Sequence, residues 1–148
     1  MDKISSFGSL SVKEIEEIEK ELKITFPKDY RNFLEICNGG IPKQNYLTLT
    51  IPEIGEEIVL GALLGKNDNK NFDLLSWNHE YSEDMIDSTI IIGTEYNSGL
   101  IILINQEEES GIYFWDNAYV FDNSSDEENV YKLCNSFTEF MDDLILDI

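Results

Sequence analysis

The spacing of the apolar residues changes along the chain, and this change limits the folds that are open to it. Up to Cys37 the apolar residues recur every three or four positions, which is typical of helices with one buried face. Beyond Pro42 they alternate with polar residues in short segments, which is typical of half-buried strands. Near the C-terminal end the helical spacing returns. This order predicts an α+β fold, with a mainly antiparallel sheet flanked by two N-terminal helices and one C-terminal helix.

Two helices are expected before the first strand. One covers about Ser11–Lys23, whose first residue forms a capping-box pair with Glu14. The other covers about Lys28–Cys37 and follows Pro27, a residue that suits the first turn of a helix. Asn38-Gly39-Gly40 ends it, because glycine accepts the left-handed conformation found at helix C-termini.

Short strands are expected over most of the remaining chain. The segments are Tyr46–Ile51, Glu57–Leu60 continued by Ala62–Leu64, Thr89–Thr94, Leu100–Asn105, Gly111–Trp115 and Ala118–Asp122. Hairpin turns are expected at Asn97-Ser98-Gly99 and at Asp116-Asn117. A short helix is predicted over residues 74–86 and the final helix over Asn129–Leu144, from the spacing of their apolar residues.

The chain has the size and composition of one domain. Its 148 residues are 42% hydrophobic, which is enough to form a core, and 27% charged, which is close to the globular average. Apolar periodicity continues through both halves, and no Pro/Gly/Ser-rich linker separates them. We therefore expect a single domain over residues 1–148.

Charge is distributed unevenly along this domain. The formal net charge is -20, from 30 acidic and 10 basic residues. Residues 1–70 hold 12 acidic and 9 basic side chains, whereas residues 71–148 hold 18 acidic side chains and one basic one, Lys132. Such a surface repels nucleic acid and anionic membranes and attracts basic proteins. The expected partner is therefore a basic protein, with no nucleic acid and no membrane.

The cysteines and the apolar runs indicate a cytoplasmic protein. Cys37 and Cys134 are expected to be buried free thiols, since two distant cysteines do not make a disulfide framework. The first residues lack the apolar core of a signal peptide. The longest apolar runs, Ile90–Ile92 and Leu100–Ile104, are far shorter than the ~20 residues of a membrane span.

Residues suited to catalysis or metal binding are few. His79 is the only histidine, and a pairing with Cys37 is disfavoured because that cysteine is expected in the core. There is no CxxC pair for zinc and no phosphate-binding glycine motif. The run Asp122–Glu128 fails as an EF-hand, since its sixth position is Glu127 and its twelfth is Leu133. We expect no catalytic residue, no cofactor and no metal, with incidental weak cation binding by that run as the alternative.

Aromatic and acidic residues occur together in the second half. Such a combination suits a partner rich in Lys and Arg, because aromatic anchors carry binding energy and charges raise the association rate. The candidate partner-binding residues are Trp77, Glu80, Asp84, Glu95, Tyr96, Trp115, Asp116 and Tyr119. The alternative is that about half of the aromatic residues simply pack the sheet. Alternation puts Tyr113 and Trp115 on one strand face and Ile112 and Phe114 on the other, without deciding which face is buried.

The second predicted helix and its flanks carry a family resemblance. Ile24-Thr25-Phe26-Pro27-Lys28-Asp29-Tyr30-Arg31-Asn32-Phe33-Leu34, followed by Cys37-Asn38-Gly39-Gly40, resembles the N-terminal signature of the SUKH superfamily. Later segments agree in order, and the resemblance spans about residues 11–145. The motif positions are Phe26, Pro27, Tyr30, Phe33, Leu34, Asn38, Gly39, Gly40, Gly93, Phe137 and Phe140. One departure is Gly93-Thr94-Glu95-Tyr96-Asn97, where the family often carries a Gly-Asp or Asp-Gly pair.

The resemblance implies an α+β fold and a non-enzymatic, protein-binding role. The superfamily joins yeast cell-wall-assembly regulators to bacterial immunity proteins, which most often neutralise a toxin such as a nuclease or deaminase. Together with the charge, it favours an immunity protein that binds a basic toxin domain. A regulatory scaffold of the cell-wall-signalling type is the alternative, although this chain has almost no disordered arms. A small-ligand or metal-dependent enzyme is the third possibility.

Overall fold

A computed structural model describes residues 3–43, 46–85, 88–119, 121, 124–125 and 129–147, and within them the chain has an α+β fold with an antiparallel sheet. The strands are β1 (Ile4–Ser6), β2 (Gly40–Pro42), β3 (Tyr46–Thr50), β4 (Glu57–Leu63), β5 (Thr89–Glu95), β6 (Leu100–Ile104), β7 (Gly111–Trp115), β8 (Val130–Cys134) and β9 (Ile145–Asp147). The helices are α1 (Val12–Leu22), α2 (Lys28–Cys37), α3 (Leu74–Glu80) and α4 (Phe137–Asp143). Among these residues, no helix combines the length and the hydrophobicity needed to cross a bilayer.

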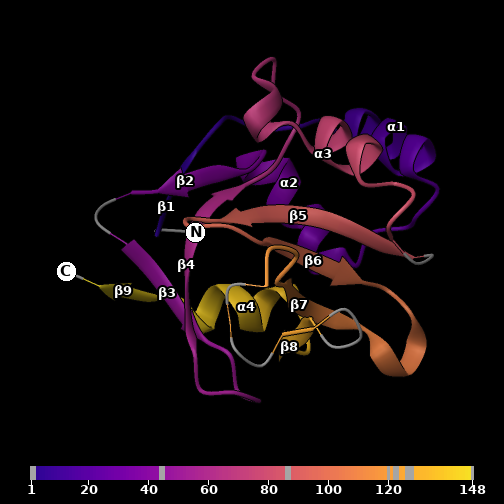
Figure 1. The fold of residues 1–148 in the computed structure, drawn as a ribbon. Helices are drawn as coiled ribbons and strands as arrows, with labels where there is room; N and C mark the ends of the chain where they lie inside the picture. Colours follow the sequence, from indigo (N-terminus) through magenta and orange to yellow (C-terminus); the bar gives the residue numbers. More distant parts are fainter. Residues whose placement is uncertain are drawn as a thin grey trace.

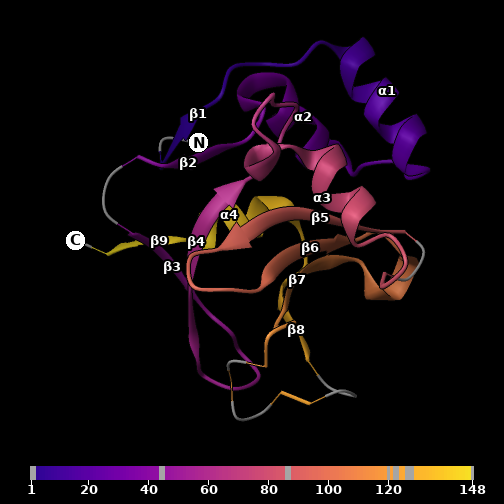
Figure 2. The same ribbon diagram turned by 45° about the horizontal axis from the view of Figure 1, so that its top comes forward.

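The strands form one continuous path with a side branch (Figure 1). The path runs β1-β2-β4-β5-β6-β7-β8, and β3 pairs with both β4 and β9. Strand β4 joins the two parts, since its first residues pair with β3 and its later residues pair with β5 and β2. A register shift between Leu60 and Ala62 marks the change. Figure 2 shows α1, α2 and α3 gathered on the β5 side of the sheet, with α4 behind β5 and β6.

The two N-terminal helices and the central strands agree with the sequence predictions. Helix α1 begins after Ser11, whose side chain accepts a hydrogen bond from the Glu14 amide in a complete capping box. Helix α2 has the expected bounds, and Asn38 ends it in the left-handed conformation, with φ of 51°. Strands β3, β5 and β6 lie within one residue of their predicted bounds. The turn at Asn97-Ser98-Gly99 joins β5 to β6.

The prediction of one final helix over Asn129–Leu144 is wrong. The segment forms strand β8 and then the shorter helix α4, because Val130–Cys134 pairs with β7. Ser136 begins the helix by accepting a hydrogen bond from the Glu139 amide at 3.1 Å. The apolar residues of the strand fit helical spacing only by chance.

The second predicted hairpin is also wrong. Strand β7 pairs with β6 and β8, not with Ala118–Asp122. Asn117 and Ala118 form a turn, and Tyr119 adopts φ of 53°, so the chain leaves the sheet after Trp115. Val120 and Asp122 lie outside the described residues. The helix predicted over residues 74–86 is shorter, because turns follow Glu80, and residue 86 also lies outside the description.

The two faces of β7 and β8 differ in burial, whereas every residue of β6 is buried. Ile112 and Phe114 are 1% and 2% exposed and face the side where α4 packs on β7 and β8. Tyr113 and Trp115 lie on the opposite face and are half-buried. The buried face of β7 is therefore the one that carries Ile112 and Phe114, which alternation alone does not decide. We call this second face the open face; its residues include Ile102, Ile104, Tyr113, Trp115, Val130 and Lys132.

The two ends of the described chain are joined by Lys3. Its ammonium group donates hydrogen bonds to the carbonyl oxygens of Met141 and Leu144, both at 2.7 Å, and of Asp142 at 3.2 Å. These carbonyls belong to the C-terminal end of α4, where a positive charge is favourable.

Asn78 fixes α3 against the sheet. Strand β4 stops hydrogen bonding to β5 at Leu64, whose amide donates to the Ile92 carbonyl. Beyond this point the Asn78 side chain forms the hydrogen bonds to β5. Its Nδ2 donates to the Ile91 carbonyl at 2.9 Å, and its Oδ1 accepts from the Ile91 amide at 2.7 Å. Asn78 is 3% exposed, so these bonds are made in the protein interior.

Replacing this amide should destabilise the protein measurably. Asn78→Ala leaves the Ile91 amide and carbonyl buried without their partner, so we expect a loss of about 2–3 kcal/mol in the free energy of unfolding. Urea denaturation measures it. Asn32→Ala, at an exposed position of α2, is the control and should change stability by less than about 0.5 kcal/mol. Equal losses for the two variants would contradict this role for Asn78.

Candidate functional site

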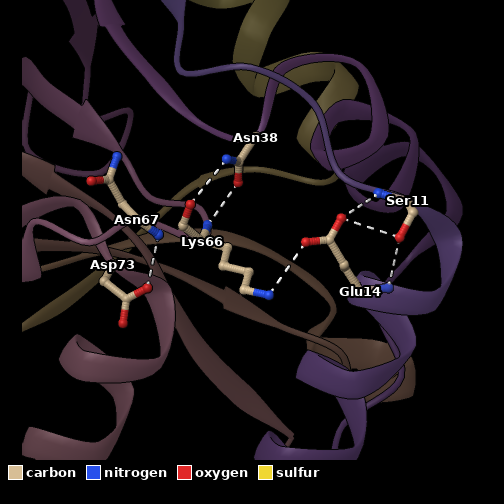
Figure 3. Close-up of polar contacts among 6 residues, drawn as sticks. All are labelled: Ser11, Glu14, Asn38, Lys66, Asn67 and Asp73. Carbon is tan, nitrogen blue, oxygen red and sulfur yellow. Dashed lines mark hydrogen bonds and ion pairs between the residues drawn. The ribbon is translucent and has the colours of Figure 1, made fainter.

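A network of hydrogen bonds places the start of α3 (Figure 3). Asp73 lies just before the helix, and its carboxylate accepts from the Ser76 amide at 3.1 Å and from the Asn67 amide at 3.0 Å. Asn38 reaches the same loop: its Oδ1 accepts from the Lys66 amide at 2.7 Å and its Nδ2 donates to the Lys66 carbonyl at 3.0 Å. The end of α2 therefore holds the loop that leads into α3.

The Asn38-Gly39-Gly40 motif has a structural explanation. Asn38 is buried and holds the backbone of Lys66 through both ends of its amide. Gly39 has φ of +82°, and a Cβ atom there would come within 2.5 Å of the Leu63 carbonyl oxygen. At Gly40 a Cβ atom would come within 2.5 Å of the Ser5 carbonyl oxygen. The motif lets α2 turn sharply into β2 between two neighbouring strands.

Lys66 extends this network to α1. Its ammonium lies 3.3 Å from Oε2 of Glu14, the capping-box residue, as Figure 3 shows. The hydrogen bond from the Ser11 amide, and then that from Lys66, lower the pKa of Glu14. Because these contacts join elements of the chain to one another, the network is structural: it sets the position of α3.

Helix α3 and the residue that caps its C-terminal end contribute two of the three side chains in a row of aromatic rings. The Trp77 and Tyr81 rings are stacked, with centroids 6.0 Å apart and an angle of 11° between their planes. The Tyr81 ring meets the Trp115 ring edge to face at 5.7 Å. All three are half-buried, and the Trp77 indole donates to the Asn71 carbonyl at 2.9 Å. We call these three residues the aromatic row; it links α3 to the open face of the sheet.

Two hollows lie beside the aromatic row. The first has a volume of about 420 Å³ and is lined by Lys70, Asn71, Ser76, Trp77 and Glu80. The second, which we call the open-face groove, has a volume of about 430 Å³ and is lined by Asp84, Met85, Thr89, Ile102, Ile104, Trp115, Asn129 and Val130. Four predicted contact residues thus come together here: Trp77 and Glu80 at one hollow, Asp84 and Trp115 at the other.

Acidic groups dominate this part of the surface. Glu80, Glu83 and Asp84 are exposed at and after the end of α3. We call these three acids and the aromatic row the α3 surface. Lys132 is the only basic residue after Lys70, and its ammonium lies 6.0 Å from the centroid of the Tyr113 ring on the open face. The arrangement can hold cationic groups beside aromatic rings.

Glu95 and Tyr96 belong to a different part of the surface. Glu95 accepts hydrogen bonds from the Val59 amide at 2.7 Å and the Asn97 amide at 2.8 Å, so its carboxylate supports the β5–β6 turn and β4. The Tyr96 ring is 61% exposed and meets the Tyr46 ring of β3 at 5.4 Å. They therefore face β3 and β4, and do not join the aromatic row.

Asp116 does not lie on an exposed contact surface, contrary to the sequence prediction. It is 0% exposed, and its Oδ2 accepts from the Phe121 amide at 2.9 Å and from the Ser124 hydroxyl at 2.6 Å. The carboxylate organises the chain that leaves β7. Tyr119, in the same segment, is 48% exposed.

Three residues of the open-face groove are not among the candidate contact residues predicted from the sequence: Ile102, Ile104 and Val130. The signal was the uninterrupted apolar run Leu100–Ile104, which indicates a strand apolar on both faces. One face of it packs in the core, and Ile102 and Ile104 on the other face lie at the base of the open-face groove, with exposures of only 5% and 7%.

The family motif residues lie in the core. The Tyr30 ring meets Phe26 at 5.2 Å and Phe137 at 5.1 Å, and the Phe33 ring meets Phe137 at 4.9 Å. Leu34 and Phe140 are 0% exposed. Pro27 stands directly before α2, and Gly93 pairs with Leu63 and Ile101 within the sheet. These positions join α2, α4 and β5.

The thiols have the surroundings of structural residues. Cys37 and Cys134 are both buried, and neither forms a disulfide bond in the described part of the chain. Burial raises the pKa of Cys37 and raises that of Cys134 to about 12, the opposite of what activates a nucleophile. His79 is exposed and lies 3.6 Å from Glu21 of α1.

No group of three His, Cys, Asp or Glu residues is placed to hold a metal ion in the ranges that the structure describes. Most of the Asp122–Glu128 run, considered above as a weak cation site, lies outside these ranges.

The fold is that of an α+β domain with an acidic and aromatic surface beside α3. The chain matches the model of the SMI1 / KNR4 family (SUKH-1) over residues 9–143, and it belongs to this family. No curated protein matches it. Family membership supports a protein-binding role of the immunity or regulatory type, in line with members known as non-enzymatic immunity proteins.

Buried groups that ionise at high pH should make the protein sensitive to alkali. Burial raises the pKa of Tyr30, Cys37 and Cys134, so the unfolded chain releases these protons at lower pH than the folded one. Stability should therefore be constant up to about pH 8 and fall as the pH rises toward 12. Urea denaturation at increasing pH measures this fall.

Tyr30→Phe is the informative control. The Tyr30 hydroxyl has no hydrogen-bond partner among the described residues, so removing it should cost no stability at pH 7. The variant should lose less stability than the wild type at pH 11. Identical pH profiles would show that the buried tyrosine does not contribute.

Proposed function

We propose that this protein is an immunity protein that neutralises a basic toxin domain through its acidic, aromatic surface. The observation that carries the proposal is the charge of residues 71–148, with 18 acidic side chains and one basic one around both tryptophans of the chain. Family membership supports an immunity or regulatory role in general.

The charge favours a toxin that acts on nucleic acid. Such an enzyme binds a polyanion with Lys and Arg, and an inhibitor with a dense negative field can occupy the same groove. The field also raises the association rate, which matters when an active toxin must be intercepted quickly.

The aromatic row supplies binding affinity that exposed charges alone do not provide. Exposed ion pairs contribute little affinity, whereas aromatic residues in a partly desolvated surface are typical hot spots. Trp77, Tyr81 and Trp115 stand half-buried next to Glu80 and Asp84, so a basic partner can bury apolar area and pair its charges at one place.

Capture and rescue together test the proposal. The tagged protein is used to capture partners at low salt from cells that encode it and from rival strains, and each eluted protein is identified by mass spectrometry. We expect one stoichiometric basic protein whose C-terminal domain kills cells when expressed alone. Co-expression of this chain should restore growth.

Charge reversal gives the matched comparison. The variant Glu80→Lys, Glu83→Lys, Asp84→Lys should lower affinity for that toxin by roughly a hundredfold at low salt and abolish rescue, because like charges would meet. The control Glu16→Lys, Glu17→Lys, Glu56→Lys makes the same change of charge at exposed positions away from the α3 surface and should keep most of the affinity. Thermal unfolding of both variants excludes misfolding.

Two results would contradict the proposal. Equal affinity losses in the two triple variants would show that total charge, not the α3 surface, matters. Several weak, salt-labile partners without toxicity would indicate a regulatory scaffold instead.

A further inference from the structure

The open-face groove combines an apolar lining with one carboxylate. Ile102, Ile104 and Val130 supply aliphatic surface from β6 and β8, and Trp115 supplies an aromatic wall. Asp84 and Met85 contribute the other side, from the segment after α3. Val130 is 42% exposed and Trp115 is half-buried, whereas Ile102 and Ile104 are 5% and 7% exposed, so Val130 and Trp115 form the solvent-accessible part of this lining.

Asp84 is available for an ion pair. In the part of the chain that the structure describes, no hydrogen bond or ion pair reaches its carboxylate from another side chain, and the residue is exposed. Lys132, the only Lys or Arg of residues 71–148, has its ammonium 6.0 Å from the centroid of the Tyr113 ring. An isolated carboxylate beside an apolar groove favours a cation that arrives with an apolar stem.

Arginine fits this combination better than any other side chain. Its methylene stem can cover aliphatic surface, and its planar guanidinium can stack on an indole while donating hydrogen bonds to a carboxylate. The guanidinium is also less strongly hydrated than an ammonium group, so it loses less on entering a half-buried site.

We infer that the open-face groove is the anchor site for an arginine side chain of the protein partner, with Asp84 pairing the guanidinium and Trp115 stacking on it. This inference rests on the proposed function in that the partner is a basic protein. The groove then supplies specificity, and the surrounding acids supply long-range attraction.

A short peptide tests the groove without the partner. The probe is acetyl-Gly-Arg-Gly-amide, added up to about 50 mM at low salt to the 15N-labelled full chain, with the Trp115 indole signal followed by NMR. The signal is assigned with Trp115→Phe and Trp77→Phe. We expect millimolar binding that shifts the Trp115 indole and the Asp84 amide more than the Glu107, Glu108 and Glu109 amides.

Matched peptides and variants show whether binding depends on the charge of the arginine side chain or only on its shape. The citrulline peptide has nearly the same shape without the charge and should bind at least tenfold more weakly, and the lysine peptide severalfold more weakly. Asp84→Asn should weaken binding of the arginine peptide at least tenfold. Asp68→Asn removes one exposed carboxylate outside the groove and should leave binding unchanged.

Three outcomes would overturn the inference. They are no shift at 50 mM peptide, equal binding of the arginine and citrulline peptides, and unchanged binding by Asp84→Asn. Each is distinguishable from failure of the proposed function, because a toxin bound and neutralised by the wild type but not by the triple charge variant would uphold that function without an arginine site. Conversely, a peptide that binds as expected, together with captured partners that are weak, salt-labile and not toxic, would leave the groove assigned and the immunity role refuted.

Discussion

The surface that we propose for partner binding depends on the side chain of Asn78, which hydrogen-bonds to the backbone of β5 beyond the end of β4. Asn78 bonds both the amide and the carbonyl of Ile91, where β4 no longer reaches β5. These bonds fix α3 against the sheet edge, while Asn38 and Asp73 fix the loop before it. Without this alignment, the rings of α3 would not meet Trp115, and neither hollow would have its present walls.

The helices and central strands could be predicted because local signals agree there with the final packing. The capping box at Ser11 and the left-handed end at Asn38 are local features, and both are observed. Val130–Cys134 could not be assigned in this way, because its apolar residues fit both helical and strand spacing. The segment forms a strand because it pairs with β7, which lies more than a dozen residues earlier in the chain.

In the candidate site, too, some features follow from the sequence and others depend on the fold. The association of Trp77, Glu80, Asp84 and Trp115 with an acidic surface follows from residue types, and the structure places them around the aromatic row. Asp116 was indistinguishable from them in the sequence, since burial of a carboxylate depends on donors supplied by the fold. Two of its donors, the Phe121 amide and the Ser124 hydroxyl, belong to described residues outside the helices and strands.

The Lys3 contacts also bear on the order in which parts of the domain can form during synthesis. Lys3 bonds to carbonyl oxygens of Met141 and Leu144, which lie far along the chain from it. A contact across 141 positions closes a long loop, which is entropically costly and cannot form until the segment that carries α4 has been made. Until then β1 lacks its anchor at α4, although the residues of the aromatic row have already been synthesised.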